Sequence, residues 1–182
     1  MSSGVVVREA GRDDARAIAA VHVHAWRWGY RELFPSSVLD ALSVDEWTRQ
    51  WSARLTQPTA DAVTFVAEGV GQVVGFAFLN RSPDDDALPG TAELQSLNVE
   101  EGAAGTGIGR LLMATATERA RLNANTILTV WVYEENVRAR RFYEAAGFRP
   151  DGVERLESHP FVPVVANEVR YQRRFGPVTR EL

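Results

Sequence analysis

The sequence predicts a mixed α/β fold in which helices pack on a central sheet. Apolar, β-branched runs alternate with stretches whose apolar residues recur at helical spacing, in the order β-α-α-β-β-β-α-β-α-β-β. A chain of 182 residues with 45% hydrophobic content is long enough to bury a core of its own. We therefore expect one domain over residues 1–175 and a polar C-terminal tail over 176–182.

The chain is predicted to begin with a strand and a helix. Residues 5–9 (VVVRE) form an apolar run of high β propensity. Asp13 or Asp14 is placed to cap a helix whose apolar positions recur at helical spacing as far as Trp28. Pro35 closes this region.

A second helix and three strands are expected next. Residues 43–46 (SVDE) form a capping-box pattern that opens a helix reaching Leu55. Residues 62–80 predict a hairpin that turns at glycine, and the Pro- and Gly-punctuated segment 82–90 predicts a loop. Residues 91–99 predict another strand.

The C-terminal half repeats this alternation. A helix is predicted after the glycine-rich segment, with one apolar stripe made of Ile108, Leu112, Ala116 and Ala120 and with Leu111 beside it. Residues 126–132 are apolar on both faces, which is typical of a central strand. Residues 135–147 predict a helix, and Gly147 suits a left-handed residue after its last turn. Two strands are expected near 148–156 and 165–174.

Composition excludes several classes of function. The net charge of −4 argues against nucleic-acid binding, which favours a basic face, and no apolar run approaches the roughly 18 residues of a membrane span. No secretory signal pattern is visible at the start, so cytoplasmic residence is expected. Cysteine is absent, and His22 and His24 lie on different sides of a helix, so no metal site is predicted. A homodimer is kept as a candidate assembly.

The segment 100–112 (EEGAAGTGIGRLL) predicts a phosphate-binding turn, because glycines ahead of a helix let backbone N–H groups approach an anion. A nucleoside triphosphate loop is excluded, since Ile108 stands where that loop needs lysine and the chain has no lysine. The spacing Gly105-x-Gly107-x-Gly109 also departs from the dinucleotide fingerprint, which remains a weaker alternative. Two interpretations stay open here: a pyrophosphate on another long cofactor, and a close helix–strand packing turn without a ligand.

Two segments together resemble a known family. LNVEEGAAGTGIGRLL and VYEENVRARRFYEAAGF, within residues 97–148, look like the two motifs of the GCN5-related N-acetyltransferase (GNAT) family. The resemblance implies a mostly antiparallel central sheet flanked by helices, acetyl-CoA as cosubstrate and an amine acceptor. The family's Gln or Arg position in the first motif is Ala104 here, so the backbone is expected to hold the pyrophosphate.

The resemblance also implies a set of cofactor-binding residues. The backbone of one strand pairs with the pantetheine, the glycine turn binds the pyrophosphate, and the second motif contributes one helix face. Asn136 has a second interpretation as a helix cap. The implied residues are Leu97, Asn98, Val99, Ala104, Gly105, Thr106, Gly107, Ile108, Gly109, Arg110, Asn136 and Ala139.

Two residues are implied as catalytic. Tyr143 matches the tyrosine taken in the family as the general acid that protonates the departing thiolate, the alternative being a packing role at the sheet edge. Glu93 resembles the family's glutamate that accepts the amine proton through water, the alternative being an exposed strand carboxylate. Phe142 is expected in the core with Ala145 and Ala146.

The sequence says least about which residues bind the acceptor amine. Trp26, Trp28 and Tyr30 are candidates for binding it, by cation–π contact if it is a cation, and the alternative places them in the core. Residues 84–86 (DDD) attract a cation or form a solvated loop, and residues 158–163 are a candidate cover for the pocket. The arginines of 138–141 reach a cofactor phosphate or form a solvated face. A non-catalytic acyl-CoA-binding or regulatory module is the alternative function.

Overall fold

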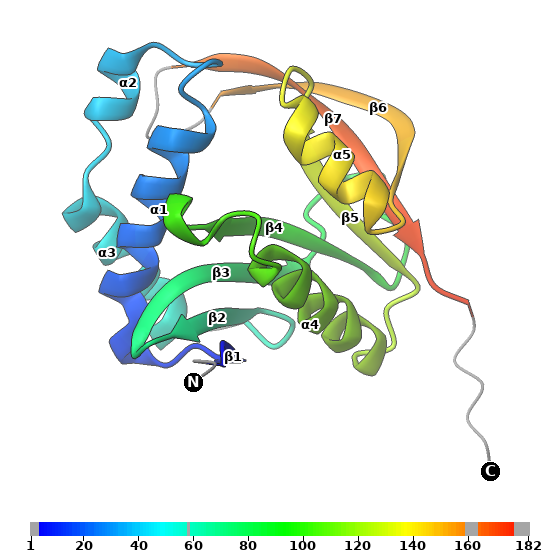
Figure 1. Ribbon diagram of the computed structural model, residues 1–182. Helices are drawn as coiled ribbons and strands as arrows, with labels where there is room; N and C mark the ends of the chain where they lie inside the picture. Colours follow the sequence, from blue (N-terminus) through cyan, green and yellow to red (C-terminus); the bar gives the residue numbers. More distant parts are fainter. Residues whose placement is uncertain (1–3, 58, 159–163, 177–182) are drawn as a thin grey trace.

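The computed structural model describes residues 4–57, 59–158 and 164–176. Its strands form one seven-stranded sheet in the order β1-β2-β3-β4-β5-β7-β6 (Figure 1). The strands are β1 (Val6–Glu9), β2 (Val63–Gly69), β3 (Gln72–Arg81), β4 (Thr91–Val99), β5 (Ile127–Tyr133), β6 (Arg149–Ser158) and β7 (Val165–Arg174). The helices are α1 (Ala15–Gly29), α2 (Ser36–Asp40), α3 (Val44–Thr56), α4 (Ile108–Leu122) and α5 (Val137–Ala145), with 3₁₀ turns at Arg12–Asp14 and Glu101–Ala103.

The predicted mixed α/β architecture is confirmed, and the elements follow the predicted order with α2 as an addition. The sequence signals for helix ends at Ser43 and Gly147 are confirmed. The Ser43 hydroxyl accepts the Glu46 N–H at 3.3 Å, and Gly147 has φ of +88° after the last turn of α5. Of the two predicted cap positions, Asp14 is the N-cap residue of α1, but its side chain makes no cap hydrogen bond; the Asp14 carboxylate instead accepts the Gly11 N–H at 2.7 Å and binds Arg8.

Helices cover the two faces of the sheet (Figure 1). α4 and α5 lie on one face, where the predicted stripe of α4 is buried against apolar residues of β2 to β5 and β7. Leu111 lies outside that stripe, exposed to solvent. α1 and α3 lie on the other face, over an aromatic core that includes Trp47, Trp51 and Phe76. Among the described residues, no helix is long and apolar enough to cross a membrane.

The sheet opens between its two parallel strands. β4 and β5 pair in parallel from Thr91–Ile127 to Glu93–Thr129 and not beyond. The remainder of β4 stays bonded to β3, and all of β5 stays bonded to β7, so the two strands diverge (Figure 1). The other strand pairs described in the sheet are antiparallel. The divergence leaves backbone groups of β4 beyond Glu93 without a neighbour on the β5 side.

Candidate active site

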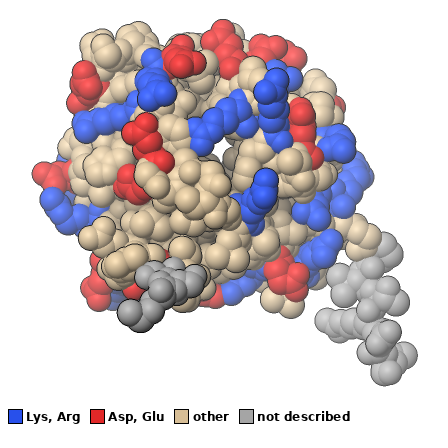
Figure 2. Space-filling model, in the orientation of Figure 1, with Lys and Arg blue, Asp and Glu red and all other residues tan. Residues whose placement is uncertain are grey.

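A cleft of about 370 Å³ occupies the gap between β4 and β5. Its walls come from the C-terminal end of α1, the turn before α4, and α5. Figure 2 shows this face of the molecule hollowed near its centre, with basic side chains around the hollow. Arg110 and Arg138 are the basic residues that line the cleft.

The glycine turn presents unpaired N–H groups to the cleft. Gly105 and Gly107 have φ of +78° and +97°, and no atom lies within 4 Å of where a Cβ would stand on either residue. Within the described chain, no backbone N–H of residues 105–110 donates a hydrogen bond to a protein acceptor. These groups lie at the N-terminus of the 15-residue α4, where the helix dipole favours an anion. The turn therefore fits a pyrophosphate.

α5 presents a small residue and a tyrosine to the same cleft. The Asn136 side chain accepts the Ala139 N–H at 3.0 Å, which is the predicted helix cap. Ala139 and Tyr143 follow on the cleft-facing side of α5. Phe142 also lines the cleft and lies 3.5 Å from the position of a Cβ on Gly109, so it packs α5 against α4, whereas Ala145 is exposed.

Tyr143 is a buried phenol, with an exposed fraction of 8%. Its ring packs against Phe142 and Phe148, at centroid distances of 5.4 and 5.8 Å. Burial, with the neighbouring Tyr30 phenol, raises the pKa of Tyr143 well above its ordinary value. Tyr143 therefore keeps its proton at neutral pH.

Glu93 lies where the two parallel strands part, as the last β4 residue paired with β5. It is buried, with an exposed fraction of 6%, and accepts a long hydrogen bond of 3.5 Å from the Ser82 hydroxyl. Burial and the neighbouring Asp84 carboxylate raise the pKa of Glu93 to about 7. Its side chain is not among those that line the cleft.

Glu168 is the carboxylate that lines the cleft among the described residues. It lies on β7 directly opposite Tyr133 of β5, with an exposed fraction of 8%. Arg155 Nε donates to Glu168 Oε2 at 2.9 Å, and Arg155 Nη2 forms an ion pair with the same oxygen at 2.8 Å. Burial raises the pKa of Glu168, and Arg155 opposes that shift.

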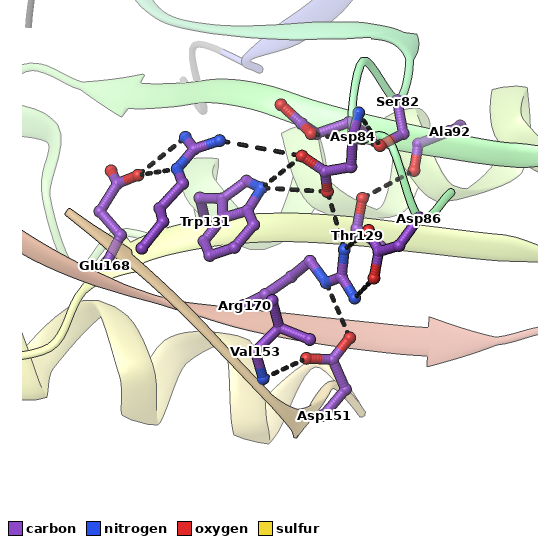
Figure 3. A network of polar contacts seen from close by, with 12 residues as sticks. Ser82, Asp84, Asp86, Ala92, Thr129, Trp131, Asp151, Val153, Glu168 and Arg170 are labelled. Atoms are coloured by element: carbon purple, nitrogen blue, oxygen red, sulfur yellow. Dashed lines mark hydrogen bonds and ion pairs between the residues drawn. The ribbon is translucent and has the colours of Figure 1, made fainter. Parts of the chain in front are cut away.

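A polar network lies beside this carboxylate and fixes the loop between β3 and β4 (Figure 3). The Trp131 indole N–H donates to both oxygens of Asp84 at 3.2 Å, and the Arg155 guanidinium lies 4.1 Å from the indole centroid. Arg170, on β7, binds Asp84, Asp86 and Asp151 at 2.6 to 3.0 Å. Residues 84–86 therefore include two aspartates held in place by Arg170.

The aromatic candidates of α1 separate into three positions. Trp26 is buried in the core among Phe34 and Tyr133 and does not line the cleft. Trp28 lies on the β4 side of the cleft, where its indole N–H donates to the Val99 carbonyl at 3.3 Å. Tyr30 lies in the cleft beside Tyr133, at a centroid distance of 5.4 Å.

A family comparison agrees with this geometry. The model of the Acetyltransferase (GNAT) family matches residues 20–148. The chain belongs to the GNAT family. It is an acetyl-CoA-dependent N-acetyltransferase by class. The uncharacterized N-acetyltransferase YuaI of Bacillus subtilis is 32% identical over 133 residues, which are 72% of this chain and 73% of that protein.

Solved structures share the GNAT fold. The PaiA N-acetyltransferase of Thermoplasma acidophilum, in complex with coenzyme A, matches with a TM-score of 0.76 at 14% identity, over 94% of this chain and 99% of that chain. The structure of yncA from Salmonella typhimurium with acetyl-CoA matches with a TM-score of 0.71 at 19% identity, over 99% of both chains. At these identities the likeness concerns the fold.

The GNAT fold brings most of the predicted cofactor residues to one cleft. Those that line it are Leu97, Asn98, Val99, Ala104, Gly105, Gly107, Gly109, Arg110, Asn136 and Ala139. Ile108 points into the core instead, and Thr106 is exposed, with its hydroxyl donating to the Ala103 carbonyl at 2.7 Å. The backbone N–H groups of both remain in the turn.

The predictions for the arginines of 138–141 and for the segment 158–163 have other outcomes. Arg138 lies 4.1 Å from the Trp28 ring centroid, and Arg140 donates to the Tyr171 hydroxyl and the Glu134 carbonyl, so these two are not a freely solvated face. The candidate cover over 158–163 lies outside the described side chains. No motif in the sequence singles out Glu168, whose one local signal is its alternation with the apolar Val169 on β7.

Proposed function

We propose that this chain transfers the acetyl group of acetyl-CoA to a primary amine by direct attack of the amine nitrogen in a ternary complex. The observation that carries the proposal is the convergence on one cleft of the unpaired N–H groups of the α4 turn, the free edge of β4 and the Tyr143 phenol. Each group matches one part of a thioester cosubstrate: its pyrophosphate, its amide-containing arm and its sulfur.

The turn at residues 105–110 would hold the pyrophosphate through its backbone, because Ala104 offers no polar side chain. The β4 backbone at Leu97 and Val99 would pair with the pantetheine as an added strand does. The Val99 carbonyl already accepts the Trp28 indole N–H, so Leu97 and the Val99 N–H are the groups that remain for this pairing.

Acetyl transfer forms a nitrogen–carbon bond and breaks the carbon–sulfur bond, and the electron pair of the broken bond leaves with the sulfur. Tyr143 donates its proton to that sulfur, so the thiol leaves neutral. An acceptor that binds as ammonium first releases one proton to solvent, because only the neutral amine has a lone pair for the attack, and its nitrogen loses a second proton as the amide forms. The Tyr143 phenolate then regains a proton from solvent.

Glu93 is assigned as the group that takes the proton released from the nitrogen as the amide forms. A carboxylate with a pKa of about 7 exists in both forms near neutral pH, as an efficient general base requires. Because the Glu93 side chain does not line the cleft, the proton reaches it through water. The absence of cysteine from the sequence removes the thiol nucleophile that an acyl-enzyme route would use.

The test is thiol release from acetyl-CoA across a panel of amines, with mass spectrometry of the acetylated product. Tyr143→Phe and Glu93→Gln should lower kcat and leave acetyl-CoA binding, measured by calorimetry, close to that of the wild type. Tight acetyl-CoA binding without transfer to any amine would instead identify a non-catalytic acyl-CoA-binding module. An unchanged kcat in Tyr143→Phe would refute its assignment as the proton donor.

A further inference from the structure

We propose that Glu168 binds the ammonium group of the acceptor, and that the acceptor is a primary amine on an aromatic or apolar body with no carboxylate beside the nitrogen. This inference rests on the proposed acetyl transfer and concerns the other half of the cleft. We place the acceptor in the part of the cleft next to β5 and β7.

The position of Glu168 suits an ammonium ligand. Both Arg155 contacts end on Oε2, and no residue in the described ranges donates to Oε1. A carboxylate with one oxygen held by arginine is fixed in orientation and keeps the lone pairs of the other oxygen for a donor in the cleft. Tyr133, the β5 partner of Glu168, lines the same wall.

The surroundings of Glu168 suit an apolar body that carries a positive charge. Tyr30, Trp131, Tyr133 and Tyr143 line the cleft with it. Tyr30 and Tyr133 meet edge to face, with an interplanar angle of 86°. Aromatic faces attract a cation and cover apolar carbon, whereas they offer few hydrogen bonds to a polyhydroxylated acceptor.

The nearby charges disfavour an acceptor that carries a carboxylate. Asp84 and Glu157 share the Arg155 guanidinium with Glu168, at 3.8 and 3.4 Å, so this arginine already faces three carboxylates. Arg170 is likewise occupied by aspartates. The remaining arginines that line the cleft, Arg110 and Arg138, come from α4 and α5 on the cofactor side.

The acceptor class is tested with a matched pair of amines, 2-phenylethylamine and phenylalanine, which differ by the carboxylate. We expect kcat/KM for 2-phenylethylamine to exceed that for phenylalanine by about tenfold or more, because like charges in a desolvated cleft repel. Equal efficiency, or transfer to other amines but not to 2-phenylethylamine, overturns the acceptor class while leaving acetyl transfer intact. Transfer to no amine overturns the proposed function together with this inference.

The residue is tested with Glu168→Gln. Loss of a buried charge-assisted bond should raise the KM for 2-phenylethylamine by about 10- to 100-fold, with kcat reduced less than in Glu93→Gln and with acetyl-CoA affinity unchanged. Glu157→Gln is the matched control, because Glu157 also contacts Arg155 but does not line the cleft, and its KM should stay within about twofold. An unchanged KM in Glu168→Gln, or a parallel loss of acetyl-CoA binding that indicates a structural role, overturns the assignment.

Discussion

Glu93 should cost the protein stability at alkaline pH, and Glu93→Gln should remove that cost. Burial together with Asp84 raises the pKa of Glu93 from an ordinary 4.5 to about 7. Between these two values the folded protein binds a proton that the unfolded chain has released, so the free energy of unfolding falls as pH rises through this window. Below pH 4.5 both states are protonated and the effect vanishes.

The size of the effect follows from the shift. Each pKa unit corresponds to about 1.4 kcal/mol, so the carboxylate destabilises the fold by about 3 kcal/mol at pH 8 and by about 1 kcal/mol at pH 5. Glutamine is neutral and of similar size, and its amide can still bond to the Ser82 hydroxyl. Glu93→Gln should therefore gain about 2 kcal/mol more stability at pH 8 than at pH 5.

Urea unfolding of the wild type and Glu93→Gln at pH 5 and pH 8 measures this difference. Glu118→Gln is the control, because Glu118 is exposed on α4, and its effect should stay within about 0.5 kcal/mol at both pH values. The same stability change for Glu93→Gln at pH 5 and pH 8 would refute the buried, proton-binding carboxylate. Such a result would also remove the physical basis for Glu93 as the general base.

Three further predictions concern the cleft and its support. Tyr143→Phe should lower kcat by about 10²- to 10⁴-fold in the thiol-release assay, with acetyl-CoA affinity retained, and a loss confined to KM would contradict the proton-donor role. Gly107→Asp should weaken acetyl-CoA binding by about 30-fold or more in calorimetry, because a left-handed φ strains the residue and the new carboxylate repels phosphate. Gly102→Asp is its control: Gly102 has an ordinary φ and does not line the cleft, so equal losses in both variants would place the pyrophosphate elsewhere. Arg170→Met should lower the free energy of unfolding by about 3–5 kcal/mol in urea titrations, since it leaves aspartates unpaired, and a neutral result would show that solvent compensates them.

Local signals in the sequence predicted the glycine turn before α4 and the cleft-facing side of α5. A left-handed φ at Gly107 and the helix start that follows it depend on neighbouring residues, and so does the single helix face shared by Ala139 and Tyr143. Such features follow from backbone sterics and helical periodicity, which a sequence displays directly. The mixed α/β fold was predictable for the same reason.

The acceptor side depends on contacts between distant segments. Glu168 faces the cleft because β7 pairs with β5, and the half-buried Asp84 is held in place because Arg170 binds it across 86 positions of sequence. The different positions of Trp26, in the core, and Trp28, in the cleft, have another cause. Their positions differ by about 200° around α1, and the predicted apolar stripe ran through Trp28, whereas Trp26 is the buried one. Periodicity therefore placed Trp28, the wrong one of the two, on the apolar stripe.

Two-substrate initial-rate kinetics test the central claim of direct transfer in a ternary complex most directly. Acetyl-CoA and 2-phenylethylamine are varied together while thiol release and acetylated amine are both measured. We expect intersecting double-reciprocal lines and one acetylated amine for each thiol released. Parallel lines, which indicate a covalent acetyl-enzyme, or thiol release without acetylated amine would contradict it.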